Sequence, residues 1–498
     1  MLTFETILYF MSEVIETART NANWWQTLKE AVAGSERDFT VGSLGTAIFL
    51  LSVPMILEMV MESAFAVVDI FFVAKLGADA VAVVGITESM LAIVYAMAIG
   101  LSVGATATVA RRTGEKDTDG AARSAIHVIY LGLIISAIIS TIGIVFAPDF
   151  LRVLGASNAV VTQGAAFTRI MLGGNAVILF LFLLNGIFRG AGDAAIAMRV
   201  LWIANILNIF LAPCFIFGKR IFEVFGINAP QFLLNYWIFP ELGVTGAAVA
   251  TNIGRGVGVV FAAWTLFRPR GRITVAAKHL RINAALLWQL LKLSSSAMIQ
   301  YTIGTASWIG LIRVVSGFGS EALAGYTIGL RIIVFALLPS VGIANADATL
   351  VGQSLGANKP ERAESAVWRA GLYSAVALAV VGVLFIVFAR SIVHLFTQEA
   401  AVADYATHCL QIVSLGFFFY GYGMVLEQSF NGAGDTWTPT WINLEIFWMF
   451  EIPLAYALAY HFGLGVYGVF WAITIAFSAL AVVSAILFRR GAWKTRTV

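Results

Sequence analysis

The sequence predicts an all-α, polytopic membrane protein with twelve transmembrane helices in two parallel six-helix lobes. Its composition, its long uncharged stretches and an internal duplication carry this prediction. Of 498 residues, 60% are hydrophobic and only 12% are charged, and the mean hydropathy is +0.87. Soluble domains carry roughly 25% charged residues, so this chain has too few charges to cover a soluble surface. Two cysteines exclude a disulfide scaffold, and a net charge of +3 without a basic block excludes nucleic-acid binding.

Long uncharged stretches locate the spans. A helix crosses about 30 Å of hydrocarbon with roughly 20 apolar residues, and segments such as 89–110 and 370–389 contain no Asp, Glu, Lys or Arg. Turn residues and charges mark the ends of the spans. The predicted spans are 47–73, 80–109, 122–147, 162–188, 194–217, 244–267, 286–314, 322–351, 364–389, 403–430, 438–460 and 465–488.

The distribution of lysine and arginine predicts the orientation in the membrane. Cytoplasmic loops are enriched in these residues, and the richest segments are the N-terminus, the 110–121 loop, the 268–285 loop and the C-terminal tail. Both termini are therefore predicted to be cytoplasmic, in agreement with an even number of spans. The first residues lack the basic region of a signal peptide. Their apolar residues recur at helical spacing between 4 and 15, which favours a helix lying on the membrane surface.

An internal duplication appears at a constant offset of 242 residues. Three matches keep this register without gaps. They are Gly190-Ala191-Gly192-Asp193 with Gly432-Ala433-Gly434-Asp435, Gly77-Ala78-Asp79-Ala80 with Gly319-Ser320-Glu321-Ala322, and Val109 and Gly114 with Val351 and Gly356. Each repeat holds an even number of spans, so the two enter from the same side and form parallel repeats about an axis along the membrane normal.

The duplication also sets the domain organisation. We expect a cytoplasmic or interfacial segment at 1–43, an N-lobe at 44–267, a cytoplasmic linker at 268–285, a C-lobe at 286–488 and a basic cytoplasmic tail at 489–498. Two such lobes can rock around a central cavity, which is a transporter architecture rather than that of an enzyme.

Several motifs resemble the multidrug and toxic compound extrusion (MATE) family. They are the segment Val68-Asp69-Ile70-Phe71-Phe72-Val73-Ala74-Lys75-Leu76-Gly77, the paired segments Phe188 to Asp193 and Phe430 to Asp435, and the stretch from Val341 to Gly356. Together with twelve spans and a repeat, the similarity covers residues 45–490. The resemblance implies a monomer in the plasma membrane that exports a small, cationic or toxic compound in exchange for protons or sodium ions. It implies no cofactor besides the coupling ion.

Some positions of this sequence match the functional residues of the family, and others do not. Pro54 and Asp69 match a proline and an acid that prokaryotic members carry fifteen positions apart in the first span. Asn208 matches an asparagine of the fifth span, but Ala212 stands where one branch has an acid. Another branch has acids in its seventh and tenth spans, and the seventh span here has none.

Three acids of the first span fall on one side of the helix. At about 100° per residue, Glu62 lies about 40° and Asp69 about 20° round from Glu58, with Pro54 at about −40°. Charges at membrane depth are costly and usually functional. The stripe therefore predicts an ion-coupling site, with Asp69 as its main ligand and Asn208 as a polar neighbour, while Pro54 is a candidate helix hinge. The alternative is that the acids are satisfied by hydrogen bonds to neighbouring helices.

The C-lobe has a different set of polar residues. The offset of 242 maps Glu58 onto Gln300 and Asp69 onto Leu311, so the lobes differ in chemistry. Glu427 lies in the tenth span, and Glu445 and Glu451 lie in the eleventh. We expect Gln300 and these acids near the substrate cavity, and Arg331 of the eighth span as a partner for one of the acids in the eleventh.

Other activities are less well supported by the sequence. No phosphate-binding loop occurs, and the five histidines form no metal-ligand pair. No catalytic cluster is evident, so an integral-membrane enzyme is the weaker alternative. A flippase for lipids or lipid-linked sugars is the nearer alternative, although its cavity needs cationic side chains and the charges noted in the spans are mainly acidic.

Overall fold

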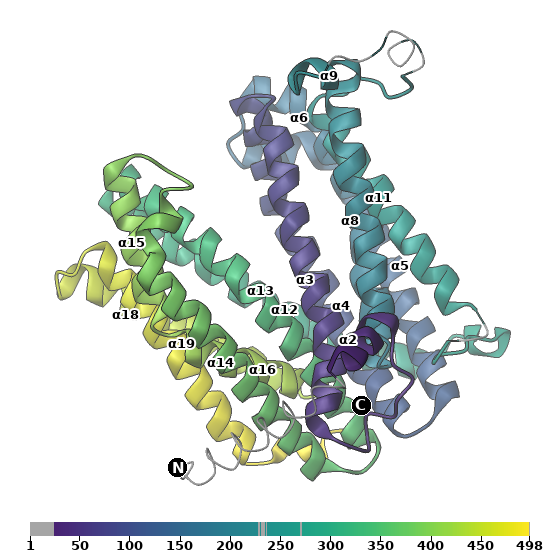
Figure 1. Ribbon diagram of the computed structural model, residues 1–498. Helices are drawn as coiled ribbons and strands as arrows, with labels where there is room; N and C mark the ends of the chain where they lie inside the picture. The colour runs from purple at the N-terminus through teal and green to yellow at the C-terminus, as the bar shows by residue number, and fades with distance from the viewer. Residues whose placement is uncertain (1–23, 228–229, 231–234, 236, 269–270, 498) are drawn as a thin grey trace.

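A computed structural model describes residues 24–227, 230, 235, 237–268 and 271–497. Two helical bundles stand side by side, and every regular element in these ranges is a helix (Figure 1). The all-α prediction is therefore confirmed. The surface helix predicted between residues 4 and 15 lies outside the described residues. The short helix α2 (Trp24–Ala33) precedes the first bundle.

The N-lobe contains six spans at the predicted positions. They are α3 (Leu44–Ala74), α4 (Ala78–Gly114), α5 (Thr118–Val153), α6 (Asn158–Gly173) with α7 (Asn175–Gly190), α8 (Ala194–Phe217) and α11 (Val244–Leu266). The fourth span is interrupted at Gly174, and a short 3₁₀ segment η1 (Gly218–Arg220) and helix α9 (Ile221–Val224) follow α8. The basic loop predicted at 110–121 is only a short turn, because α4 continues to Gly114 and α5 begins at Thr118.

The C-lobe repeats this arrangement. Its elements are η2 (Ala277–Leu280), α12 (Ala284–Val315), η3 (Ser316–Phe318), α13 (Ser320–Gly356), α14 (Pro360–Val393), α15 (Ala400–Ser414), α16 (Phe417–Gly432), α17 (Trp437–Asn443), η4 (Leu444–Glu451), α18 (Ile452–Tyr456), η5 (Ala457–His461), α19 (Val466–Arg489) and η6 (Ala492–Thr495). The tenth span is bent by 61° between α15 and α16. The eleventh span runs from α17 to η5 and contains two π-helical segments, η4 and η5.

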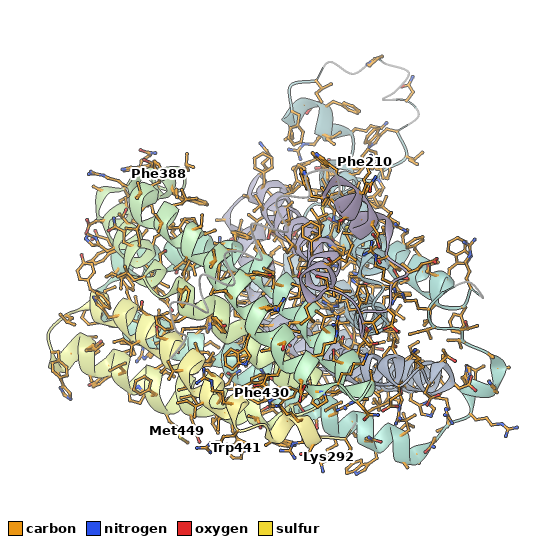
Figure 2. All side chains as sticks on the ribbon, turned by 60° about the horizontal axis from the view of Figure 1, so that its bottom comes forward. Phe210, Lys292, Phe388, Phe430, Trp441 and Met449 are labelled. Atoms are coloured by element: carbon orange, nitrogen blue, oxygen red, sulfur yellow. The ribbon has the colours of Figure 1, made fainter. Side chains whose placement is uncertain are left out.

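Length and hydropathy support the spans. Among the described residues, 10 helices are long and apolar enough to cross a membrane, and the bent pair α15–α16 is an eleventh. The helix α12 has 32 residues at the place of the predicted seventh span, but it is too polar to be identified by this test. Large apolar side chains such as Phe210, Phe388 and Met449 are more than half exposed on the outside of the bundles (Figure 2). Such a surface suits contact with lipid.

The duplication is visible in the backbone as well as in the sequence. Three turns repeat with nearly the same positive φ at positions 242 residues apart. The pairs are Gly77 and Gly319 (both 101°), Gly192 and Gly434 (81° and 85°), and Lys116 and Asn358 (60° and 56°). Positive φ is uncommon for residues with a side chain, so its recurrence at Lys116 and Asn358 shows that the turn geometry itself is duplicated.

The lobes meet through a reciprocal contact between α4 and α13. A Cβ at Gly114 would clash with the main-chain carbonyl of Gln353, and a Cβ at Gly356 would clash with that of Arg111. Arg111 and Gln353 occupy equivalent positions, 242 residues apart. The side chain of each also donates a hydrogen bond to a main-chain carbonyl of the other lobe. Arg111 Nη2 donates to the carbonyl of Ala433 (3.3 Å), and Gln353 Nε2 donates to the carbonyl of Gly190 (3.0 Å). We call these contacts the reciprocal latch.

The linker and the tail cover the same end of the molecule. Arg272 of the linker donates to the carbonyl of Ala191 (3.2 Å), and Arg496 of the tail forms an ion pair with Asp435 (3.3 Å). A basic residue outside the helices thus contacts each of the two repeated Gly-x-Gly-Asp turns, and Arg111 of α4 also contacts the second. We call this end, with the loops 115–117, 271–283 and 357–359 and the tail 490–497, the basic face. In the orientation predicted from the lysines and arginines, it faces the cytoplasm.

Candidate functional site

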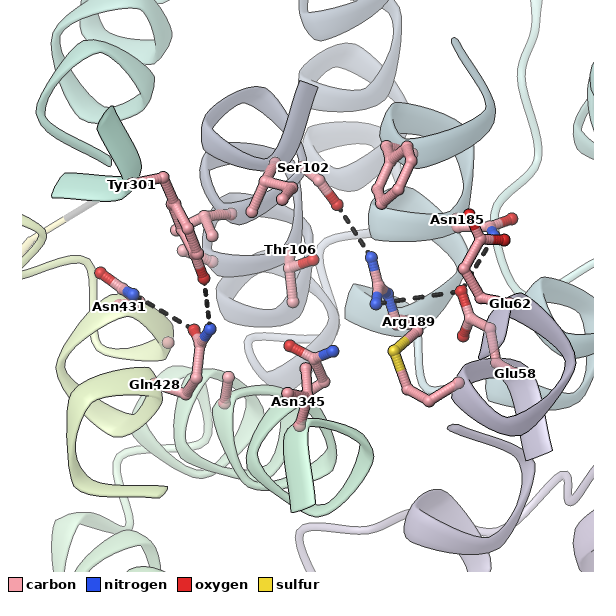
Figure 3. A pocket seen from close by; sticks show the side chains of 18 of the residues that line it. Glu58, Glu62, Ser102, Thr106, Asn185, Arg189, Tyr301, Asn345, Gln428 and Asn431 are labelled. Atoms are coloured by element: carbon pink, nitrogen blue, oxygen red, sulfur yellow. Dashed lines mark hydrogen bonds and ion pairs between the residues drawn. The ribbon is translucent and has the colours of Figure 1, made fainter. Parts of the chain in front are cut away.

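A cavity of about 320 Å³ lies between the lobes. Helices α3, α4, α7 and α8 line it from the N-lobe, and α12, α13 and α16 line it from the C-lobe (Figure 3). Most of the wall is apolar. The polar lining side chains are Glu58, Glu62, Ser102, Thr106, Asn185, Arg189, Tyr301, Asn345, Gln428 and Asn431. This combination of apolar walls with few polar groups is typical of small-molecule sites, which commonly measure about 300–1,000 Å³.

Glu58 lies in the wall of this cavity and is only 3% exposed. Asn185 Nδ2 donates to its Oε1 (3.0 Å), and Arg189 Nη1 is 4.0 Å from the same oxygen. Arg189 Nη2 also donates to Ser102 Oγ (2.9 Å). The charge of Glu58 is therefore balanced by a buried arginine from α7.

Glu62 lies one turn further along α3 and has an arginine of its own. Arg255 Nη2 of α11 donates to Glu62 Oε1 (3.0 Å), and Asn205 Nδ2 of α8 donates to Oε2 (2.9 Å). The guanidinium of Arg255 is 1% exposed and lies over the rings of Phe65 and Tyr95. Burial among apolar rings makes this ion pair costly to break, because either charge alone lacks solvent.

Asp69 is the third acid of the stripe, and it is outside the cavity wall. Its Oδ1 is sealed from solvent and has no hydrogen-bond partner among the described residues. The charges that act on it are those of Glu88 in α4 and Arg255, which already pairs with Glu62. Glu88 in turn interacts with Arg331 from α13 of the other lobe. Asp69 is therefore a half-buried acid with one sealed oxygen, and the described residues provide no cation of its own.

The other predicted N-lobe residues have structural contacts. Asn208 is buried and donates to Thr251 Oγ1 of α11 (2.9 Å), which is the interhelical alternative rather than a hydrogen bond to Asp69. Pro54 is buried inside an uninterrupted α3. It lies close to the point where Gly342 of α13 packs against the backbone of Ile56. Its role as a hinge stays a prediction.

The predicted C-lobe residues are divided between interior and surface. Gln300 is buried and Glu427 is half-buried beside lining residues Tyr301 and Gln428, although neither of them lines the cavity itself. Glu427 lies next to Asn443. Each has a side-chain oxygen without a partner among the described residues.

The two acids of the eleventh span differ. Glu451 is 1% exposed and lies near Tyr326 and Tyr420, whereas Glu445 is exposed. Arg331 forms no ion pair with either acid in the described part of the chain, so the predicted pairing is not seen. The reason is geometric: Arg331 is exposed on α13 and its charge acts on Glu88 across the lobe boundary.

Several further charged residues in the spans were not singled out from the sequence, and four of them bear on the site. They are Glu88, Arg189, Arg255 and Asp347, the last of which accepts a hydrogen bond from Ser429 Oγ (2.6 Å). Each interrupts an apolar run, and this is the signal that could have identified them. Among the described residues, no group of three or more His, Cys, Asp or Glu could hold a metal ion.

The fold and the cavity define a two-lobed membrane transporter. A family model for MatE matches residues 54–214 and again 297–457, one match in each lobe. The chain belongs to the MatE family. Both the recognition of the family and the twelve-helix, two-repeat architecture are thereby confirmed.

Individual relatives cover nearly the whole chain. A probable multidrug resistance protein, NorM, from Thermotoga maritima is 24% identical over 454 residues, which are 90% of this chain and 93% of the relative. An FAD transporter from Shewanella oneidensis is 21% identical over 412 residues, covering 83% and 87%. A solved structure of the outward-facing conformation of a multidrug resistance MATE family transporter superimposes with a TM-score of 0.83. It is 26% identical and covers 92% of this chain and 98% of that one.

Proposed function

We propose that this protein is a secondary active antiporter that exports small organic molecules in exchange for protons or sodium ions. The observation that carries the proposal is the charge balance of the N-lobe. Two of the four described carboxyl groups at membrane depth form ion pairs with buried arginines, Glu58 with Arg189 and Glu62 with Arg255, and the charge of Arg331 acts on a third, Glu88. Asp69 is the acid that remains.

A buried carboxylate without a counter-charge is unfavourable. Asp69 therefore needs a proton, a sodium ion or a positive group of the substrate as its partner. Binding of such a partner depends on the position of the lobes. Glu88 acts on Asp69 within the N-lobe, and Glu88 also interacts with Arg331 of the C-lobe. When the lobes separate at this point, Glu88 loses that arginine, and the negative charge beside Asp69 has fewer positive neighbours. Ion binding at Asp69 and the arrangement of the lobes are thus energetically linked.

The direction of transport follows from the predicted orientation. The reciprocal latch closes the basic face, which is predicted to be cytoplasmic, and one of the related structures is described as outward-facing. Relatives named as multidrug resistance proteins support export of small molecules from the cell across the plasma membrane. A cationic substrate and a monomeric state stay predictions.

The flippase alternative has less support from the cavity. Arg189 is its one cationic lining residue within the described part of the chain, and Glu58 balances that charge. A phosphate group of a lipid headgroup would need several basic side chains. An enzyme is not supported, because the relatives are transporters.

Purified protein in liposomes tests the proposal. An outward-directed substrate flux is measured with a proton gradient alone, with a sodium gradient alone, and with neither. We expect one of the two gradients to drive accumulation against the substrate gradient. Equal, purely downhill flux under all three conditions would contradict the antiport proposal. Protein-free liposomes serve as the control and measure the passive leak of substrate across the bilayer.

A further inference from the structure

The mainly apolar wall of the central cavity has polar side chains on both sides, and their charges nearly cancel. Its N-lobe wall contributes two carboxylates, Glu58 and Glu62, and the guanidinium of Arg189. Arg255 stands directly behind Glu62 and pairs with it. Two negative and two positive charges thus meet at this wall, so the wall has no excess negative charge to attract a simple organic cation.

Arg189 has unused hydrogen-bonding capacity toward this space. Its Nη2 donates to Ser102, but its Nη1 is 4.0 Å from Glu58, which is too long for a hydrogen bond. Its Nε also has no partner among the described residues, but this atom is sealed from the cavity, so Nη1 is the group that can reach a ligand. Figure 3 shows the guanidinium reaching into the cavity between Ser102 and Glu58. A planar guanidinium with free N–H groups suits a carboxylate, sulfonate or phosphate oxygen.

The C-lobe wall supplies neutral hydrogen-bonding groups. Tyr301 accepts a hydrogen bond from Gln428 Nε2 (2.6 Å), so its own hydroxyl proton is free to donate. Asn431 donates to Gln428 Oε1 (3.1 Å), while Asn431 Oδ1 has no partner in the described structure. The side chain of Asn345 also lines the cavity. These groups can orient a polar ligand without adding charge.

We propose that the preferred substrates are zwitterionic organic molecules, whose anionic group binds Arg189 and whose cationic group lies near Glu62. This deepens the proposed function, since it names the substrate class of the exporter. A ligand with both charges matches the paired carboxylates and guanidinium, and it leaves the charge balance of the buried wall unchanged.

A matched pair of probes tests the substrate class. Rhodamine 110 carries a carboxylate and a delocalised cation, and rhodamine 123 is its methyl ester, which keeps the cation and loses the carboxylate. Binding of each probe to the purified protein is measured by fluorescence anisotropy without any ion gradient. We expect the zwitterion to bind about tenfold more tightly than the ester, as a hydrogen bond to a charged group predicts.

Variants at Arg189 test the assigned contact. Arg189→Gln should abolish the preference for the zwitterion, while the ester binds as well as before or better because Glu58 loses its counter-charge. Arg189→Lys should keep part of the preference. Arg313→Gln, which changes an exposed arginine of α12, is the matched control and should keep all of it.

The ratio of the two affinities within one preparation is independent of the folded fraction. A wild-type protein that binds the ester as tightly as the zwitterion, or an unchanged ratio in Arg189→Gln, would overturn the inference. Because binding is measured without a gradient, this outcome is distinguishable from failure of ion coupling in the liposome experiment.

Discussion

At the scale of single residues, the decisive feature is the pairing of buried acids with buried arginines. Helical spacing alone could predict that Glu58, Glu62 and Asp69 share one side of α3, and all three are directed toward other N-lobe helices. The spacing could not predict their partners, since Asn185, Arg189 and Arg255 are far away in the chain. In the described part of the chain, Glu58 and Glu62 each have an arginine partner, and Asp69 has none of its own.

The ion pair between Glu62 and Arg255 predicts a specific pattern of stability. Arg255→Met leaves Glu62 without its counter-charge and should lower the unfolding free energy by about 3–5 kcal/mol. Adding Glu62→Gln should recover most of this loss, because no unpaired charge then remains. Denaturant titration in detergent micelles measures both changes.

Arg152→Gln is the control for this pair. It removes an ion pair with Asp149 in which both side chains are more than half exposed, and it should have no measurable effect. A double variant as unstable as Arg255→Met alone would contradict the assigned ion pair.

At the scale of elements, the long helices α4 and α13 set how closely the lobes approach. Each helix has a glycine at the reciprocal latch, Gly114 in α4 and Gly356 in α13, and each glycine packs on the backbone of the other helix. Gly114 and Gly356 are recognisable in the sequence as a repeated pair, but their function as the contact point could not be inferred without knowing which helices cross. Likewise, apolar runs predicted the spans, yet the 61° bend in the tenth and the π-helical segments in the eleventh depend on packing and were not predicted.

Gly114→Ala should weaken closure of the basic face, because the added methyl group meets the carbonyl of Gln353. A reporter cysteine at Ser354, which is 1% exposed, measures closure through its labelling rate with a membrane-impermeant maleimide. Replacing Cys214 and Cys409 with alanine removes the native thiols. We expect labelling to increase several-fold, and Gly356→Ala should act alike by symmetry.

Gly85→Ala is the matched control on the same helix, since a Cβ there meets nothing within 4 Å. It should leave labelling unchanged. Equal labelling in Gly114→Ala and Gly85→Ala would show that the latch does not limit opening.

At the scale of the whole molecule, one duplicated bundle supplies two lobes with similar backbones and different chemistry. The N-lobe pairs Glu58 and Glu62 with arginines, whereas the C-lobe acids Asp347, Glu427 and Glu451 have no ion pair among the described residues. The repeat, the number of spans and their order could be predicted from the sequence. The cavity could not, because its lining comes from seven helices of both lobes.

The central claim is that Asp69 couples ion movement to export. Its most direct test compares the wild type with Asp69→Asn in liposomes under the gradient that drives the wild-type protein, with Asp79→Asn, an exposed acid at the start of α4, as control. Asp69→Asn should still bind rhodamine 110 but no longer accumulate it against its gradient, while Asp79→Asn should transport normally. Gradient-driven accumulation by Asp69→Asn at the wild-type rate would contradict the assignment of Asp69 as the coupling residue.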